Sequence, residues 1–195
     1  AGLGTSPIPS LAFVLTFIFP HSLGEFTMLV NTVMFLIQAA LLGRAFGKVQ
    51  LLQLPAALLF SACIDGWMYI LGFWKTGSYV GQVLMLLLGC VFLGLGIAFE
   101  VIPNVLILPG EGLVRVIAGL TGWRFGLVKT GFDMSIVASA VGVSLFFTGH
   151  VLGIREGTVL AALIVGSISH FFIEKVSNVL EGWIPDYSDA GDASP

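Results

Sequence analysis

The sequence predicts an all-α polytopic membrane protein, composed of two inverted three-helix repeats that each carry a short half-membrane helix after a Gly/Pro turn. Composition is the first reason: 57% of the 195 residues are hydrophobic and only 10% are charged, against roughly 25% in soluble domains. The lengths of the apolar runs and a similarity between the two halves are the other reasons. This composition excludes an ordinary soluble globule and makes the lipid bilayer the expected surrounding. Nucleic acid is not an expected partner, because the chain has no basic cluster.

Apolar runs between Gly, Pro and charged residues define the expected helices. A helix rises 1.5 Å per residue, so about 20 residues are needed to cross a hydrocarbon core roughly 30 Å thick. Residues 8–19 and 113–122 form runs that are too short, and we expect these helices to enter the membrane without crossing it. Five runs are long enough to span, at residues 26–43, 51–73, 79–102, 132–151 and 157–176. The polar stretch 185–195 is expected to be a disordered tail.

The two halves align when the sequence is shifted by about 102 residues. The matched pairs are Pro7 with Pro109, Gly24 with Gly126, Asn31 with Asp133 and, after three further residues of shift, Asp65 with His170. We therefore expect a first repeat over residues 1–78 and a second over residues 79–184. The second repeat has a long run before its turn and the first does not, so a further helix of about 25 residues is expected before Ala1. The alternative is a five-span protein that begins at this residue.

The Lys and Arg residues indicate the orientation. If the two short helices do not cross, six basic residues face one side of the membrane and two face the other: Arg44, Lys48, Arg115, Arg124, Lys129 and Lys175 against Lys75 and Arg155. Basic residues concentrate on the cytoplasmic side, so we expect a cytoplasmic C-terminus. An odd number of spans per repeat inverts the second repeat relative to the first. Inverted repeats with broken helices recur in secondary transporters, where the ligand binds at the repeat interface.

Several segments carry a family resemblance. These are the turn Ala1-Gly-Leu-Gly-Thr-Ser-Pro7, the segment Ser22-Leu-Gly-Glu-Phe26 that runs into Asn31, and Pro109-Gly-Glu-Gly-Leu113 followed by Gly131-Phe-Asp133. Together they resemble the YitT/YczE-like family of bacterial integral membrane proteins, over nearly the whole chain. The resemblance implies a multi-pass protein of the bacterial plasma membrane with a transmembrane helix before the first turn. It also implies a transport role, which is presumed for the family.

Four polar residues lie inside the expected spans, namely Asn31, Asp65, Asp133 and His170. An ionisable side chain at such a position costs about 2.5–3.5 kcal/mol. We expect Asn31 and Asp65 to share a layer in the outer half of the membrane. Asp133 and His170 would share the matching inner layer, within hydrogen-bond reach or joined by one water, and could accept protons near neutral pH. The alternative is that all four side chains form interhelical hydrogen bonds that hold the helices together.

Two turns interrupt the helices at equivalent places. They contain Gly2, Gly4 and Pro7 in the first half and Pro109, Gly110, Glu111 and Gly112 in the second. Backbone groups freed by such breaks must be satisfied by protein or by water, and the start of each short helix can attract an anionic group. The alternative is an interfacial elbow without a ligand. Glu111 is expected either to cap its helix or to bind a cation.

These observations predict one of two functions. The first is a transporter of a small solute or ion with its site at the repeat interface, and proton coupling is one option. The second is a non-transporting accessory or regulatory membrane subunit; assembly as a homo-oligomer is compatible with both. An enzyme is not expected, because the sequence has no Ser/His, Glu-x-x-His or paired-aspartate signature. It also has no Cys/His set at metal-ligand spacing, so we expect neither a metal nor a cofactor.

Overall fold

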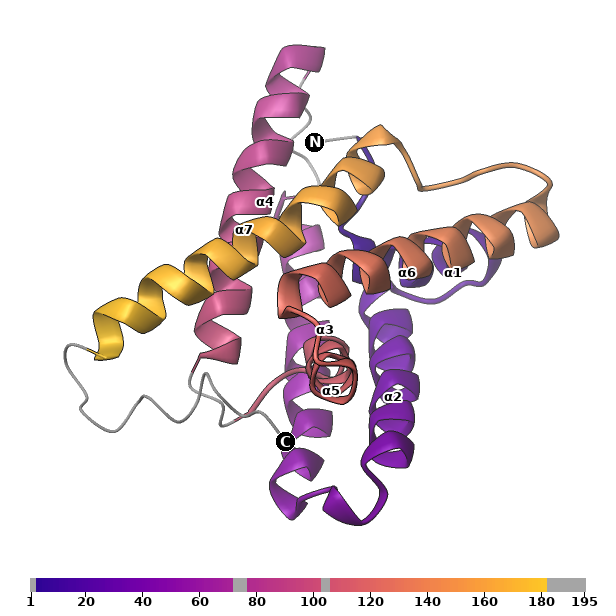
Figure 1. Cartoon of the computed structure of the whole chain (residues 1–195). Helices are drawn as coiled ribbons and strands as arrows, with labels where there is room; N and C mark the ends of the chain where they lie inside the picture. The colour runs from indigo at the N-terminus through magenta and orange to yellow at the C-terminus, as the bar shows by residue number, and fades with distance from the viewer. Residues whose placement is uncertain (1–2, 72–76, 103–105, 182–195) are drawn as a thin grey trace.

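The computed structural model describes residues 3–71, 77–102 and 106–181, and for residues 177–181 it describes the backbone alone. Gly2 and the predicted tail 185–195 lie outside these residues. Within the described ranges the regular structure is helical, without strands. The α-helices are α1 (Pro7–Ile18), α2 (Leu23–Leu42), α3 (Gln53–Leu71), α4 (Tyr79–Val101), α5 (Pro109–Thr121), α6 (Phe125–Thr148) and α7 (Glu156–Glu181), with two short 3₁₀ helices between α2 and α3 (Figure 1).

Among the described residues, five helical segments are long and apolar enough to cross a membrane, as the sequence predicts. They are Leu23–Ala45, Lys48–Leu71, Tyr79–Val101, Phe125–Thr148 and Glu156–Val176. By contrast α1 has 12 residues and α5 has 13, which corresponds to about 18–20 Å of helix. The predicted division into five long and two short helices is therefore confirmed.

The start of α5 differs from its predicted position. The run expected at 113–122 begins at Pro109, because proline at the first helical position gives up a backbone N–H that would lack a partner in any case. Gly110 and Gly112 thus belong to the first turn of α5 and do not break it. A Cβ on Gly110 would lie 2.9 Å from Ile8 Cδ1, and one on Gly112 would lie 3.0 Å from Gln38 Oε1. These glycines allow α5 to approach α1 and α2.

Equivalent helices of the two halves start at a constant spacing. The starts of α1 and α5, and those of α2 and α6, are each separated by 102 residues, and the starts of α3 and α7 by 103 residues. Both short helices have proline at the first helical position. The shift found in the sequence therefore describes the order and the spacing of the helices.

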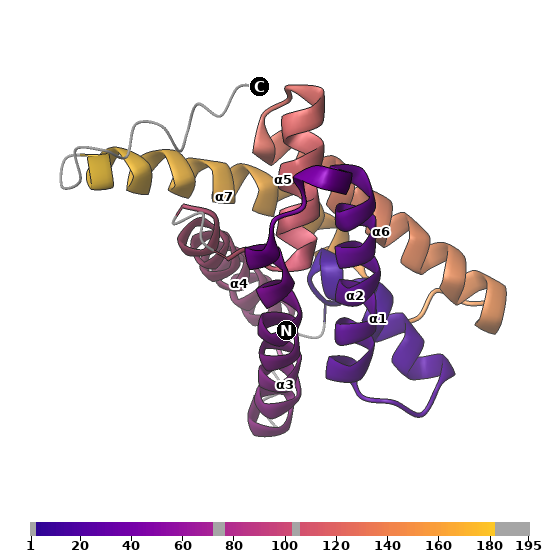
Figure 2. The same cartoon turned by 90° about the horizontal axis from the view of Figure 1, so that it is seen from below.

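The packing of the helices follows the same correspondence. Helix α1 packs on α2 of its own half and on α6 of the other half, while α5 packs on α6 and on α2. Likewise α2 packs on α3, and α6 packs on α7; α2 and α3 lie side by side in both views (Figures 1 and 2). Exchanging the halves thus turns each of these contacts into another observed contact. In addition, α4 packs along α7.

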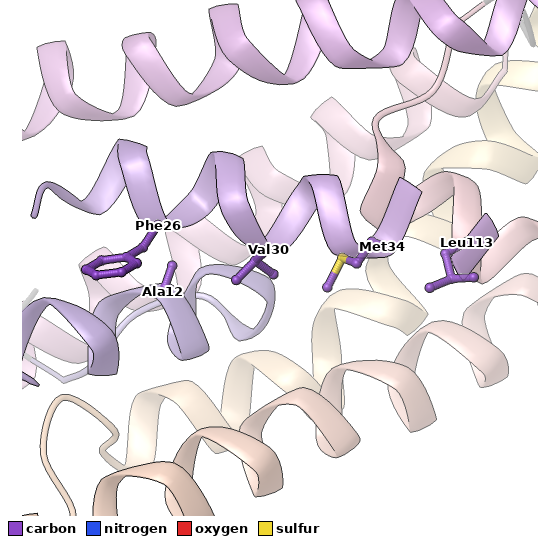
Figure 3. Close-up of a cluster of buried hydrophobic side chains, with 5 residues drawn as sticks. All are labelled: Ala12, Phe26, Val30, Met34 and Leu113. Carbon is purple, nitrogen blue, oxygen red and sulfur yellow. The ribbon is translucent and has the colours of Figure 1, made fainter. Parts of the chain in front are cut away.

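The short helices lie between the long helices and form the centre of the apolar core. One cluster joins α1, α2 and α5 through Ala12, Phe26, Val30, Met34 and Leu113. Figure 3 shows Phe26, Val30 and Met34 on one face of α2, with Ala12 of α1 opposite. A second cluster joins α1 to α6 and α7 and contains Val14, Val137, Ala140, Ile154 and Ala162. Since α1 contributes to both clusters, it connects the two halves.

Glycines mark equivalent close approaches in the two halves. At the start of α2, a Cβ on Gly24 would clash with the Ser61 carbonyl oxygen of α3. At the start of α6, a Cβ on Gly126 would lie 2.8 Å from the Gly166 carbonyl oxygen of α7. Gly24 and Gly126 are paired by the shift of 102, and Ser61 and Gly166 by the shift of 105. The correspondence between the halves therefore extends to individual interhelical contacts.

Candidate functional site

A cavity lies where helices of the two halves meet, and the three charged residues that are buried in the described part of the chain, Glu111, Lys129 and Asp133, line it. Its volume is about 60 Å³. The polar side chains on its wall come from α2, α5, α6 and the residue before α1, and they are Asn31, Glu111, Lys129, Asp133 and Ser6. Two of these, Asn31 and Asp133, are candidates from the sequence and occupy equivalent positions in the two halves. The structure thus brings this pair together.

Lys129 holds two carboxylates in the wall of the cavity. Its Nζ lies 2.7 Å from Asp133 Oδ1 and 3.5 Å from Glu111 Oε1. Lys129 and Asp133 are one turn apart on the same face of α6, whereas Glu111 comes from the first turn of α5. The side chains of all three are 10% exposed or less, and that of Asp133 is fully buried. Buried charges of this kind require partners, because removal from water is costly.

The charges of the cluster do not balance when the carboxyl groups are ionised. Two carboxylates face one ammonium group, and the second carboxylate oxygen of Asp133, Oδ2, is buried without a hydrogen-bond partner among the described residues. Glu100 of α4 is within electrostatic range of both Glu111 and Lys129, and it accepts a hydrogen bond from the Leu108 amide. With its carboxyl groups ionised, the site therefore carries negative charge in excess.

Asn31 adds an uncharged polar group to this cavity. Its Nδ2 donates a hydrogen bond of 3.0 Å to the Thr27 carbonyl oxygen one turn earlier in α2. This bond uses one of the two N–H groups of the amide, so Asn31 keeps a second N–H and its carbonyl oxygen as polar groups for other partners.

The start of α1 also reaches the cavity, but it is a poor anion site. Pro7 and Pro9 line the cavity and carry no backbone N–H, so the first turn of α1 has few donors to offer. At the start of α5 the buried Glu111 carboxylate itself supplies negative charge. The anion binding that the sequence suggested at both helix starts is therefore not supported by this geometry.

The first turn has a packing role at Gly4. Gly4 has φ of 107°, a conformation that favours glycine, and a Cβ here would clash with Thr158 Oγ1. The following amide, that of Thr5, donates to this Oγ1 at 3.0 Å, and the Gly157 amide donates to the Leu3 carbonyl oxygen at 3.0 Å. The segment before α1 is thus attached to the start of α7, which fits the elbow alternative.

Asp65 lies outside the cavity and ties α3 to the start of α2. Its carboxylate accepts hydrogen bonds of 2.7 Å from the Ser22 hydroxyl and of 2.7 Å from the Gly24 amide. Gly24 precedes Asn31 by seven residues, so Asp65 lies about 10 Å closer to the start of α2 than Asn31 does. The expected layer of Asn31 with Asp65 does not form.

His170 is separated from Asp133 in the same way. The Cβ of His170 is adjacent to Gly126, seven residues before Asp133 on α6, and its Nε2 lies 3.6 Å from Glu174 Oε1. Asp133 Oδ1 pairs with Lys129 instead. The expected hydrogen bond between Asp133 and His170 is therefore absent from the described residues.

Lys129 is a site residue that the sequence analysis does not identify, because its position outside the apolar runs predicts a charge on the cytoplasmic face. It is only 2% exposed, which leaves five basic residues on the expected cytoplasmic face against two on the other. The spacing of four residues between Lys129 and Asp133 is the signal that could have revealed the pair.

Comparison with known proteins agrees with the family resemblance. The family model described as "Family of unknown function (DUF6198)" matches residues 1–174. The chain is also 27% identical over 193 residues to the "Uncharacterized membrane protein YczE" of Bacillus subtilis (strain 168), an alignment that covers 99% of this chain and 84% of the relative. No solved structure matches the chain. The chain therefore belongs to the DUF6198 family of YczE-like membrane proteins.

Proposed function

We propose that this membrane protein is a transporter of a small solute or ion, and that its path passes the cavity formed by Asn31, Glu111, Lys129 and Asp133. The observation that carries the proposal is a buried, unbalanced charge cluster of the second half, which lines a cavity whose wall comes from both halves of the chain. Ionisable groups at membrane depth are costly, and they mark substrate and ion pathways in membrane proteins. Three ionisable groups around one cavity would lower the stability of a purely structural bundle, so their presence favours a functional role.

The proposal includes an inverted-repeat architecture with α1 and α5 as half-membrane helices. Its support is the matching order of helices, the exchangeable packing scheme and the equivalent contacts at Gly24 and Gly126. In transporters built from inverted repeats, the site lies at the repeat interface and opens alternately to the two sides. Here α1 packs on α6 and α5 packs on α2, so each short helix contacts a long helix of the other half. A shift of one half against the other would therefore open the cavity.

The charge cluster suggests how such opening is controlled. Lys129 of α6 bridges a carboxylate of α5 and one of α6 itself. Movement of α5, which packs on α2 of the other half, would therefore break the contact with Glu111 and leave the pair with Asp133 intact. A proton or a solute that neutralises one carboxylate weakens the bridge and favours the change. We place the protein in the bacterial plasma membrane with a cytoplasmic C-terminus, on the remaining excess of basic residues.

Flux through purified protein in liposomes tests this function. The panel comprises radiolabelled monovalent metal ions, small amines and amino acids, with a pH-sensitive dye inside the vesicles to detect coupled protons. We expect Asp133→Asn to abolish uptake of the transported solute, since it removes the charge while keeping the side-chain shape. Asp65→Asn is the matched control, because Asp65 lies outside the cavity, and it should retain uptake.

Wild-type uptake by the Asp133→Asn protein would contradict the proposal and make the cluster structural. Uptake of no panel member, together with a partner protein that co-purifies in stable proportion, would instead favour the accessory-subunit alternative.

A further inference from the structure

We infer that the Glu111–Lys129–Asp133 cluster binds a small monovalent cation, with Asp133 Oδ2 as its principal ligand and Lys129 as a built-in competitor. This inference rests on the proposed function in regarding the cavity as a ligand site, and it adds the chemical class of the ligand. Binding itself can be measured without transport.

The sign of the ligand's charge follows from the groups around the cavity. Lys129 on α6 is the one basic side chain on the wall, and it faces Asp133 of the same helix and Glu111 of α5. Glu100 of α4 lies close enough to interact with this group, while α2 contributes the neutral Asn31 and the start of α1 contributes the neutral Ser6. When Glu111 and Asp133 are both ionised, one added positive charge brings the cluster of three to neutrality.

The available ligand atoms are those that hard cations prefer. Asp133 Oδ2 is fully buried in the cavity wall without a hydrogen-bond partner among the described residues. Glu111 and Asn31, which carry a carboxylate and an amide carbonyl oxygen, line the same space. Carboxylate and carbonyl oxygens replace the hydration shell of alkali cations in channels and transporters.

The size of the cavity restricts the ligand further. A volume of about 60 Å³ holds a bare ion with a few waters, whereas sites for drug-sized molecules occupy roughly 300–1,000 Å³. A divalent ion is disfavoured by the adjacent Lys129 ammonium. Within the described part of the chain, moreover, His, Cys, Asp and Glu form no group of three or more that could hold a metal ion.

Lys129 determines how tightly such a cation would bind. Its Nζ forms an ion pair with Asp133 Oδ1 at 2.7 Å, so a cation that binds Asp133 lies close to an ammonium group. The repulsion lowers the affinity and lets the ion leave again, as a transported ion must. Removing the ammonium group should therefore tighten cation binding.

Thermal unfolding of the purified full chain in detergent tests the inference. Sodium, potassium and choline chlorides are compared at equal ionic strength and fixed pH. We expect sodium or potassium to raise the melting temperature over choline in a saturable way, because a ligand that binds the folded state stabilises it. Asp133→Asn should abolish this shift, and Asp65→Asn, the control carboxylate outside the cavity, should retain it.

Lys129→Met should lower the half-saturating cation concentration by about tenfold or more. Equilibrium binding of radioactive sodium or rubidium to the detergent-solubilised protein provides a second readout where a variant unfolds early. Equal stability in all three salts, or a cation shift that persists in Asp133→Asn, would overturn the inference. A melting temperature that follows pH but no cation would also overturn it, because the site would then take a proton. Since these assays need no transport, cation binding without solute flux would remove only the proposed function.

Discussion

Replacing Lys129 by Met should strongly destabilise the protein, because it leaves two buried carboxylates without their counter-charge. With an effective dielectric constant of about 20, attraction at 2.7 Å to Asp133 and at 3.5 Å to Glu111 is worth about 6 and 5 kcal/mol. The burial cost of the ammonium and the repulsion between the carboxylates offset much of this sum. Measured losses on breaking buried ion pairs are about 3–5 kcal/mol, and we expect a loss of free energy of unfolding in this range.

The charge-balanced variant separates this effect from lost packing. Adding Glu111→Gln and Asp133→Asn to Lys129→Met removes every charge of the cluster, so we expect the triple variant to recover most of the loss. The assay is reversible unfolding by sodium dodecyl sulfate in mixed micelles, followed by circular dichroism. A loss below about 1 kcal/mol in Lys129→Met, as found for solvent-exposed pairs, would refute the reasoning. So would a triple variant no more stable than the single one.

Three other perturbations address the remaining contacts, and the same unfolding assay measures each. Asp65→Ala should cost about 1–3 kcal/mol through lost hydrogen bonds to the start of α2; no loss would mean that this tie contributes nothing to stability. Gly126→Ala should cost about 1–3 kcal/mol by overpacking against α7, whereas Gly131→Ala, which meets open space, should be nearly neutral; equal effects would contradict the close approach. His170→Gln should leave both the free energy of unfolding and the uptake into liposomes unchanged, because His170 does not contact Asp133. A loss of uptake equal to that of Asp133→Asn would instead support the predicted pairing of His170 with Asp133.

The helices could be predicted from the sequence because they depend on local information. Run length and composition separate the five long segments from the two short ones, and the positions of Pro7 and Pro109 mark both short helices. The start of α6 is the main boundary error. The run was expected to begin at residue 132, but the helix begins at Phe125, because its Lys129 is neutralised by carboxylates within the bundle and can be buried.

The partners of the candidate residues could not be predicted, because they depend on helix rotation and on which turns of adjacent helices lie opposite each other. The same error occurs in both halves. Asp65 lies opposite Gly24, which is seven residues before its predicted partner Asn31. His170 lies opposite Gly126, which is seven residues before its predicted partner Asp133. The shift of the sequence pairs Asp65 with His170, and each of them lies opposite the glycine at the start of the adjacent helix. Such a shift relates positions in the two halves and does not identify contacts within either half.

The cavity itself also escaped prediction, since its walls come from helices far apart in the sequence. The sequence shift makes Asn31 and Asp133 equivalent positions but predicts that they lie in opposite layers of the membrane. The structure places both on the wall of one cavity, because each short helix packs on a long helix of the other half, α1 on α6 and α5 on α2. This interlocking of the halves is a tertiary feature that run lengths do not encode.

Access to the cavity from both sides of the membrane is the most direct test of the transport account. Asn31→Cys is introduced with Cys63→Ser and Cys90→Ser, which remove the two native thiols, and Ala140→Cys, at a buried residue away from the cavity wall, is the matched control. A membrane-impermeant thiol reagent is applied to right-side-out and inside-out vesicles. The account predicts labelling of Asn31→Cys from each side and of Ala140→Cys from neither. Labelling of Asn31→Cys from one side alone, or from neither, would contradict alternating access.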